Sequence, residues 1–278
     1  MYIDSHAHLF YEDYQDDLEA VVRRAQEAGV EAIVVPGTTL ETSREALRLA
    51  EQYPFIYACV GFHPHEASKA TEQSLREIEA LSTHEKVVAI GEIGLDFHYD
   101  FSPRENQQKV FADQIEIAVR RNLPIVVHTR ESMAGAVAAV SEAVKRNPGW
   151  KASTRVGGNG SRPLRGVFHC FTGTTHEARQ LFAMGFLVSY PGIVTFKNSS
   201  VLDTLKSIGV ENILLETDSP YLTPAPHRGK RNEPANVVYV ANKIAELFSA
   251  QPFEIAGVTA ANTRALFGIG INNFRGNR

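Results

Sequence analysis

The chain has 278 residues, of which 44% are hydrophobic, and a formal net charge of −4 at pH 7. That length suffices for a sizeable buried core, and no apolar run approaches the roughly 18 residues that would indicate a membrane-spanning helix. The mild negative charge argues against a protein that coats nucleic acid through bulk charge, although a local basic patch is compatible with it.

The sequence also predicts a compartment. The two cysteines, Cys59 and Cys170, lie in apolar runs that read as strands, which excludes a disulfide framework and favours a reducing environment. The N-terminal residues lack the basic and apolar regions of an export signal. We therefore expect a cytoplasmic protein.

Short β-branched runs alternate with longer amphipathic stretches along the whole chain. The runs predict eight strands, at 2–5, 31–36, 56–61, 87–91, 124–128, 166–169, 186–190 and 212–216. The stretches between them predict helices near 14–28, 40–53, 73–82, 104–121, 131–146, 175–184 and 199–208, and two more follow at 235–249 and 253–266. Strict alternation over this length predicts an α/β protein with one domain, 1–278, built as a (β/α)8 TIM barrel with extra C-terminal helices.

The alternative fold is an open, doubly wound sheet. Such sheets bind ligands at one switch point, usually through a glycine-rich first turn. In this chain the first turn is rich in histidine, and polar residues recur after nearly every strand. The pattern therefore favours the closed barrel.

The first predicted strand ends in "DSHAHLF", which places His6 and His8 two residues apart. Alternate side chains of a strand share a face, so both histidines would point in one direction. At the carboxyl end of a barrel strand that direction can be the barrel mouth. Taken alone, the motif is equally compatible with a pair of surface histidines.

The third predicted strand ends in "GFHPHE", which provides His63 and His65. Pro64 restricts the residue before it to extended geometry, so both histidines would project from a rigid turn. They could be metal ligands, phosphate contacts or a proton donor to a leaving group. The alternative is a packed loop with incidental histidines.

Four later strands also end in residues that can carry chemistry. These residues are Glu92 after the fourth strand, His128 and Arg130 after the fifth, His169 after the sixth and Asp218 after the eighth. Singly, the acid could form an ion pair with a barrel arginine, and each histidine could be a satisfied core residue. Together they would gather at the carboxyl face, where TIM barrels have their active sites.

Imidazole and carboxylate groups are the usual ligands of Zn, Mn and related divalent ions. Four histidines and two carboxylates, namely His6, His8, His128, His169, Glu92 and Asp218, exceed the needs of one ion. Two ions that share a bridging carboxylate would use them all. Two-metal sites can activate water for phosphoester hydrolysis.

A basic cluster follows the eighth strand within "APHRGKRNEPANV", residues 225–237. Arg228, Lys230 and Arg231 could bind phosphate oxygens beside the barrel mouth, and Arg130 is a further candidate. The alternative is an ordinary solvated run of charges. Three aromatic residues could stack on bases, although aromatic residues in barrel loops more often pack: Phe62, Phe101 and Tyr221.

Seven ordered motifs, spread from about residue 2 to 267, resemble the TatD family of metal-dependent deoxyribonucleases. They are D-S-H-A-H-L, G-x-H-P-H, G-E-I-G-L-D-F, V-V-H-T-R, F-H-C-F-T-G, L-E-T-D-S-P-Y-L and R-G-K-R-N-E-P. The family belongs to the amidohydrolase superfamily, so the resemblance implies a distorted TIM barrel. It also implies hydrolysis of DNA phosphodiesters, including trimming of single strands from the 3′ end.

The resemblance further implies roles for individual residues. His6, His8 and Asp218 would hold one ion, and Glu92 would bridge to a second ion. His128 and His169 would complete the second site. Asp218 would orient or deprotonate the attacking water, and His65 would contact the scissile phosphate. Magnesium is the ion expected to support activity, although a histidine-rich shell also suits zinc or manganese.

The chain departs from the family pattern at 147–165, which is rich in Gly, Ser and Arg and has no hydrophobic periodicity. We predict a flexible inserted loop here. Its basic residues, Lys151, Arg155, Arg162 and Arg165, suggest a weak nucleic-acid contact. An obligate protein partner is not indicated.

Two rival functions remain at this stage. The same metal site could hydrolyse an amide, a lactone or an aminoacyl ester, because metals activate water for any of these electrophiles. A non-catalytic nucleic-acid-binding factor is the other alternative, but the complete ligand set argues against it.

Overall fold

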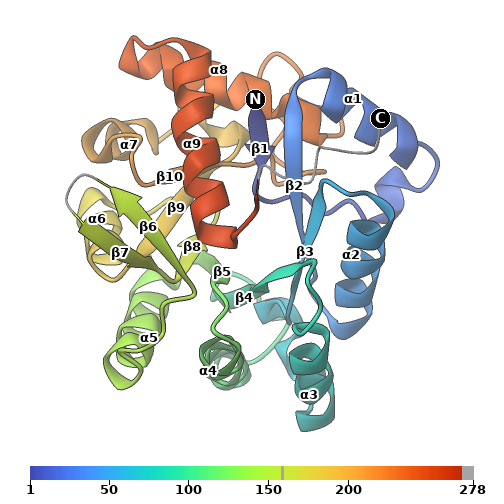
Figure 1. The fold of residues 1–278 in the computed structure, drawn as a ribbon, viewed down its shortest axis with the longest axis vertical. Coiled ribbons are helices and arrows are strands. Elements are labelled where there is room, and N and C mark those ends of the chain that lie inside the picture. The colour runs from blue at the N-terminus through green and yellow to red at the C-terminus, as the bar shows by residue number, and fades with distance from the viewer. Residues whose placement is uncertain (158–159, 271–278) are drawn as a thin grey trace.

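The structure, a computed structural model, describes residues 1–157 and 160–270 (Figure 1). Eight parallel strands lie in the order β1-β2-β3-β4-β5-β8-β9-β10, which confirms the predicted TIM barrel. Their bounds are β1 Tyr2–Asp4, β2 Val30–Pro36, β3 Ile56–Val60, β4 Val87–Asp96, β5 Ile125–Arg130, β8 Gly166–Phe168, β9 Phe186–Tyr190 and β10 Ile213–Leu215.

Helices cover the outside of the barrel, as Figure 1 shows. Their bounds are α1 Leu18–Glu27, α2 Leu40–Gln52, α3 Glu72–Leu81, α4 Arg104–Arg121, α5 Met133–Arg146, α6 Thr175–Ala183, α7 Leu202–Ile208, α8 Val237–Phe248 and α9 Pro252–Phe267. Outward-facing strand residues and these helices form the larger apolar core. In the described part of the chain, no helix has both the length and the apolar character needed to cross a bilayer.

The last helix, α9, lies across the amino ends of the barrel strands. Asn262 donates to the backbone oxygens of Glu211 and Ile213, at the start of β10. Leu266 and Phe267 pack with the inward-facing strand residues as a second apolar cluster. The amino end of the barrel is therefore filled by apolar packing, which leaves the carboxyl end for polar groups.

Backbone hydrogen bonds close the barrel between the segment after β1 and the segment around β10. Ser5 N donates to Leu215 O at 3.0 Å. Further along, Asp218 N donates to His6 O at 2.9 Å, and His8 N donates to Ser219 O at 2.8 Å. These bonds fix the first histidine pair beside the segment that carries Asp218.

A buried carboxylate reinforces this closure. Asp4 accepts hydrogen bonds from Thr217 N at 2.9 Å, Thr217 Oγ1 at 2.6 Å and His6 N at 3.2 Å. Burial raises the pKa of the Asp4 carboxyl to about 7, while the bonds from Thr217 and His6 lower it. The side chain thus satisfies two buried backbone donors and also binds the Thr217 hydroxyl, which has a second partner in Ser219 Oγ.

The segment predicted as an aperiodic loop contains regular structure. β6 (Ser153–Gly157) and β7 (Gly160–Leu164) pair as an antiparallel hairpin. The nucleic-acid contact proposed for Arg165 is wrong, because Arg165 is buried and its Nη1 donates to Met184 O at 2.9 Å. Lys151 is exposed. Residues 158–159 and 271–278 and the side chains of Arg155 and Arg162 lie outside what the structure describes.

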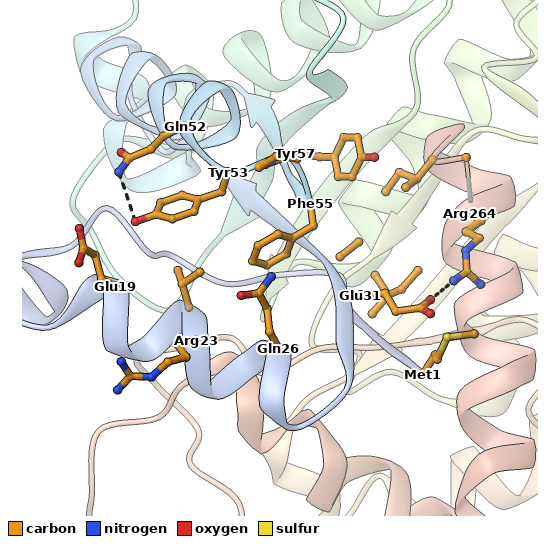
Figure 2. A pocket seen from close by; sticks show the side chains of 16 residues that line it. Met1, Glu19, Arg23, Gln26, Glu31, Gln52, Tyr53, Phe55, Tyr57 and Arg264 are labelled. Atoms are coloured by element: carbon orange, nitrogen blue, oxygen red, sulfur yellow. Dashed lines mark hydrogen bonds and ion pairs between the residues drawn. The ribbon is translucent and has the colours of Figure 1, made fainter. Parts of the chain in front are cut away.

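A cavity of about 770 Å³ lies beside α9 at the amino ends of the first three strands (Figure 2). Tyr53, Phe55 and Tyr57 line it, and an ion pair joins Glu31 to Arg264 at its edge. The described lining contains no histidine and no cysteine. The cavity therefore lies apart from the residues that the motifs single out.

We expect Asp4→Ala to lower the free energy of unfolding by about 2–4 kcal/mol, because it leaves buried backbone donors unpaired. Urea unfolding followed by circular dichroism measures this loss. Asp203, exposed on α7, provides the control, and Asp203→Ala should change stability by less than about 0.5 kcal/mol. An equal effect of the two substitutions would contradict the role of Asp4 in barrel closure.

Candidate metal centre

A cavity of about 300 Å³ opens at the carboxyl ends of the barrel strands. Most of the residues predicted from the strand-end motifs line it, namely His8, His63, His65, Glu92, His128, Arg130, His169 and Asp218. His6 is fully buried next to them. The strand ends thus bring together side chains that are far apart in the sequence.

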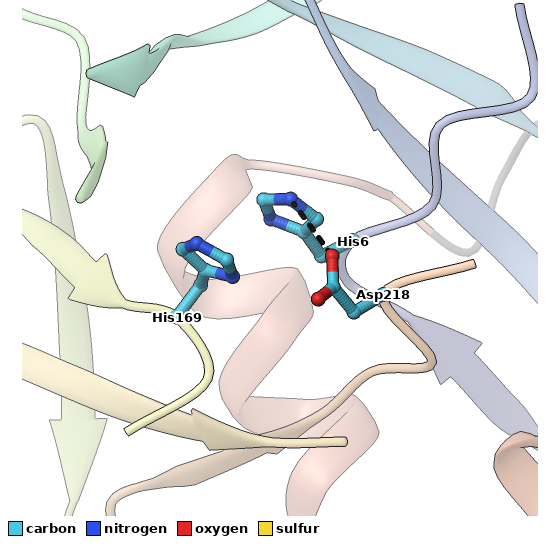
Figure 3. Close-up of side chains that lie close together, drawn as sticks. All are labelled: His6, His169 and Asp218. Carbon is cyan, nitrogen blue, oxygen red and sulfur yellow. Dashed lines mark ion pairs between the residues drawn. The ribbon is translucent and has the colours of Figure 1, made fainter. Parts of the chain in front are cut away.

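One group of donor atoms lies where β1 meets β10. His6 Nε2 and His8 Nε2 are 3.2 Å apart, and they lie 3.3 and 3.6 Å from Glu92 Oε2. Asp218 Oδ1 is 3.8 Å from His6 Nε2 and 3.7 Å from His8 Nε2. Figure 3 shows His6 and Asp218 turned toward each other, with His169 beside them. Donors at the corners of a tetrahedron with metal bonds of 2.0–2.1 Å are about 3.3 Å apart, so this spacing fits one divalent ion.

A second group surrounds the other oxygen of the same carboxylate. Glu92 Oε1 lies 2.8 Å from His169 Nε2, 3.0 Å from His128 Nδ1 and 3.5 Å from His63 Nε2. His128 Nδ1 and His169 Nε2 are 3.3 Å apart. Glu92, His63 and His128 have donor atoms close enough together to hold an ion. Of the roles that the sequence left open for His63, its position favours that of a metal ligand.

The protonation of two of these rings suits cation binding, whereas His128 differs. Burial would lower the pKa of His128, but hydrogen bonds with Asp96 and Glu92 raise it to about 9, so a bound ion would have to displace its proton. Burial lowers the pKa of His8 to about 3, and it lowers the pKa of His63 well below its usual value. These two rings are therefore neutral and have a free lone pair. Burial alone would raise the pKa of Glu92, but the surrounding histidines outweigh it and hold this pKa well below its usual range. An ionised carboxylate surrounded by imidazole nitrogens is a donor set for a divalent transition metal.

Asp96 is a site residue that was not predicted from the ends of the strands. Its Oδ2 accepts from His65 Nε2 at 2.8 Å and lies 3.1 Å from His128 Nε2. β4 was predicted to end at residue 91, but it continues to Asp96. The prediction placed Glu92 just after the end of this strand. In the structure the strand continues through Glu92 to Asp96 and is buried along its whole length. Gly94 permits this because a Cβ there would be 2.1 Å from His128 O.

Glu216 is a second missed residue, although it stands in the quoted motif around Asp218. It is fully buried and accepts from Ser189 Oγ at 2.5 Å and from Cys170 N at 2.6 Å. Its Oε1 is 3.9 Å from His169 Nδ1. Glu216 thus holds the backbone next to His169 and lies near the outer nitrogen of that ring, which forms no hydrogen bond in the structure.

The basic cluster after β10 does not line the cavity. The Arg231 guanidinium forms an ion pair with Asp17, with contacts of 2.7 and 2.8 Å. Arg228 donates to a backbone oxygen and lies over the Phe196 ring at 3.7 Å. Lys230 is exposed. Of the four predicted phosphate-binding cations, the structure brings Arg130 to the cavity and places the other three outside its lining.

Comparisons with known proteins agree with the motif analysis. The sequence model of the family described as TatD related DNase matches residues 3–268. The uncharacterized metal-dependent hydrolase YabD of Bacillus subtilis is 44% identical over 270 residues, which cover 97% of this chain and all of that protein. The 3′-5′ ssDNA/RNA exonuclease TatD of Shigella flexneri is 34% identical, over 96% of this chain and 98% of its own.

The fold is likewise similar to that of solved structures. The crystal structure of YJJV, a TatD homologue from Escherichia coli K12, has a TM-score of 0.86 and 31% sequence identity. The similarity covers 97% of this chain and 98% of that one. The barrel and its helices are therefore shared over nearly the full length.

We expect the protein to bind two divalent ions, and we expect the two donor groups to fail separately. His8→Ala and His128→Ala should each leave about one ion per chain, whereas Glu92→Gln should leave less than one, because both groups use its carboxylate. Dialysis against zinc or manganese followed by elemental mass spectrometry measures the content.

His176, exposed on α6, provides the control, and His176→Ala should keep both ions. Circular dichroism checks that each variant is folded. Retention of two ions by Glu92→Gln would contradict the shared carboxylate.

Proposed function

This chain belongs to the TatD-related DNase family of metal-dependent hydrolases, and we propose that it hydrolyses phosphodiester bonds of single-stranded nucleic acid, DNA in particular, from the 3′ end. The observation that carries the proposal is the position of Glu92, whose two oxygens face two separate groups of donors at the floor of an open cavity. The name of the Shigella flexneri relative, a 3′-5′ ssDNA/RNA exonuclease, supports the choice of substrate.

Two ions would be held by the residues around Glu92. His6, His8 and Asp218 would complete the first site, and His128 and His169 the second. His63 is within reach of the second site, and His169 also lies close to His6 and Asp218. When bound, such ions activate water and stabilise the attacking and leaving oxygens of a phosphodiester. The many imidazole donors favour zinc or manganese, and the family resemblance favours magnesium, so all three ions are to be compared.

Asp218 would take the proton from the attacking water. Burial raises the pKa of its carboxyl to about 7, with His6 opposing the shift and Glu92 adding to it. A general base works best when its pKa is close to the pH at which the enzyme operates. The side chain lines the cavity, so its carboxylate is accessible to a water molecule at the substrate.

His65 and Arg130 would bind the phosphate. The bond of His65 Nε2 to Asp96 fixes the orientation of the ring and leaves its second nitrogen for a phosphate or leaving-group oxygen. Arg130, at the end of β5, supplies a positive charge at the same cavity. Guanidinium groups are well suited to phosphate oxygens because they donate two parallel hydrogen bonds.

We expect Asp218→Asn to lower the rate of oligonucleotide cleavage at least about 100-fold, because an amide cannot accept the proton from water. Digestion of 5′-labelled single-stranded DNA and RNA, with magnesium, manganese or zinc, measures the rate and shows whether shortening starts at the 3′ end. The exposed Asp203 gives the matched control Asp203→Asn, which should keep full activity.

Equal cleavage by wild type and Asp218→Asn would remove Asp218 from the catalytic assignment. If wild type cleaves no oligonucleotide with any of the three ions but hydrolyses an amide, lactone or aminoacyl ester, the proposed substrate is wrong.

A further inference from the structure

Exposed aromatic side chains gather at the mouth of the candidate metal centre. Among the side chains that the structure describes, five large apolar ones are exposed: Met1, Tyr99, Phe101, Tyr221 and Phe253. Tyr221 lines the cavity, and the rings of Tyr99 and Phe101 contact His65, which also lines it. Single exposed apolar residues need no explanation, but three around one polar cavity indicate a binding surface.

Tyr221 stands at the end of the cavity formed by β1 and β10. Its ring, 54% exposed, lies 6.5 Å from His8 and 6.1 Å from Tyr11. Tyr11 in turn stacks on His8 at 5.1 Å. One aromatic face is thus presented to solvent beside the first group of metal donors.

Phe101 stands just outside the cavity lining, next to His65 and in the loop between β4 and α4. Its ring, 66% exposed, lies 4.8 Å from His65 and 5.3 Å from Tyr99. Arg130 lies over the Tyr99 ring at 4.7 Å. Here the second aromatic face is presented beside the proposed phosphate contacts.

Hydrogen bonds hold the loop that carries Phe101 in place. Ser102 Oγ donates to His65 O at 2.8 Å, and Gln107 Nε2 donates to Ser102 O at 2.9 Å. Both Ser102 and Gln107 are buried. The backbone that carries Phe101 is therefore held in place, which lowers the entropic cost of ordering this loop around a bound base.

A continuous row of polar contacts separates the two aromatic faces. Starting next to Tyr221, it runs from His8 to Glu92 (3.6 Å), His128 (3.0 Å), Asp96 (3.1 Å) and His65 (2.8 Å), which contacts Phe101. A phosphate bound along this row would have one aromatic ring on each side.

We propose that Tyr221 and Phe101 each stack on one base, on either side of the phosphate bound at Glu92, so that the site recognises two unpaired nucleotides rather than a phosphate alone. This inference rests on the proposed function and specifies its substrate. Base stacking on aromatic rings tolerates any sequence because every base has a π-face. Bases inside a duplex are already stacked and paired, so two such faces select single strands.

The test combines substitutions in the protein with removal of single bases from the substrate, and it measures cleavage for every combination. The substrates are one single-stranded oligonucleotide and two versions with an abasic residue at either of its last two 3′ positions. In wild type, each abasic residue should lower kcat/KM about tenfold, and Phe101→Ser or Tyr221→Ser should each lower it about tenfold on the normal strand. One abasic substrate lacks the base that the substituted side chain would stack on. On that substrate, each variant should have the same kcat/KM as wild type.

Phe253, 71% exposed on α9 and outside the cavity lining, is the matched control. Phe253→Ser should cleave every substrate at the wild-type rate. Unchanged cleavage of the normal strand by Phe101→Ser and Tyr221→Ser would overturn the proposal. So would an equal loss on the normal and both abasic strands, because that pattern indicates a structural role only.

Equilibrium binding separates this proposal from the proposed function. Fluorescence anisotropy with the divalent ion present, and with Asp218→Asn added to every protein to stop cleavage, measures the affinity for the same strands. If wild type cleaves nothing, the hydrolytic assignment fails, yet a tenfold loss of affinity in Phe101→Ser and Tyr221→Ser, for every strand except the one that lacks the variant's own base, would still support stacking. Equal affinity of wild type and variants for every strand would reject stacking, whatever the cleavage result.

Discussion

Closure of the barrel between β1 and β10 is the constraint on which the candidate site depends. Asp4 accepts from both the backbone and the hydroxyl of Thr217, and the bonds from Ser5, His8 and Asp218 continue the seam. Two of those residues are also candidate metal ligands. The same two short segments thus form the hydrogen bonds that close the barrel and carry the residues of the first donor group. The site therefore cannot form before the barrel is closed.

Glu92 couples the two halves of the site in a similar way. Its carboxylate is almost fully buried, which would be costly for an unpaired charge. Five histidines lie within 3.6 Å of its two oxygens and offset that cost. Because each oxygen serves a different donor group, a shift of this one side chain changes both groups, and neither can be regarded as an independent site.

The sequence was sufficient for the parts of the structure that depend on local pattern. Hydrophobic periodicity located the strands and helices, and strand ends located most donors. What it missed depends on contacts between distant segments. Asp96 gains its role from His65 and His128, each more than 30 residues away along the chain. Arg231 appeared to be a free cation because its partner, Asp17, is 214 positions away.

The distribution of charge around the cavity explains why metal ions and aromatic rings would matter together. Arg130 is the only arginine or lysine in the described lining, and the whole chain carries a net charge of −4. Proteins that bind nucleic acid mainly through phosphate contacts present many more cations than this. We infer that bound divalent ions neutralise the phosphate at the centre, and that Tyr221 and Phe101 supply the affinity at the edges that a basic surface would otherwise provide.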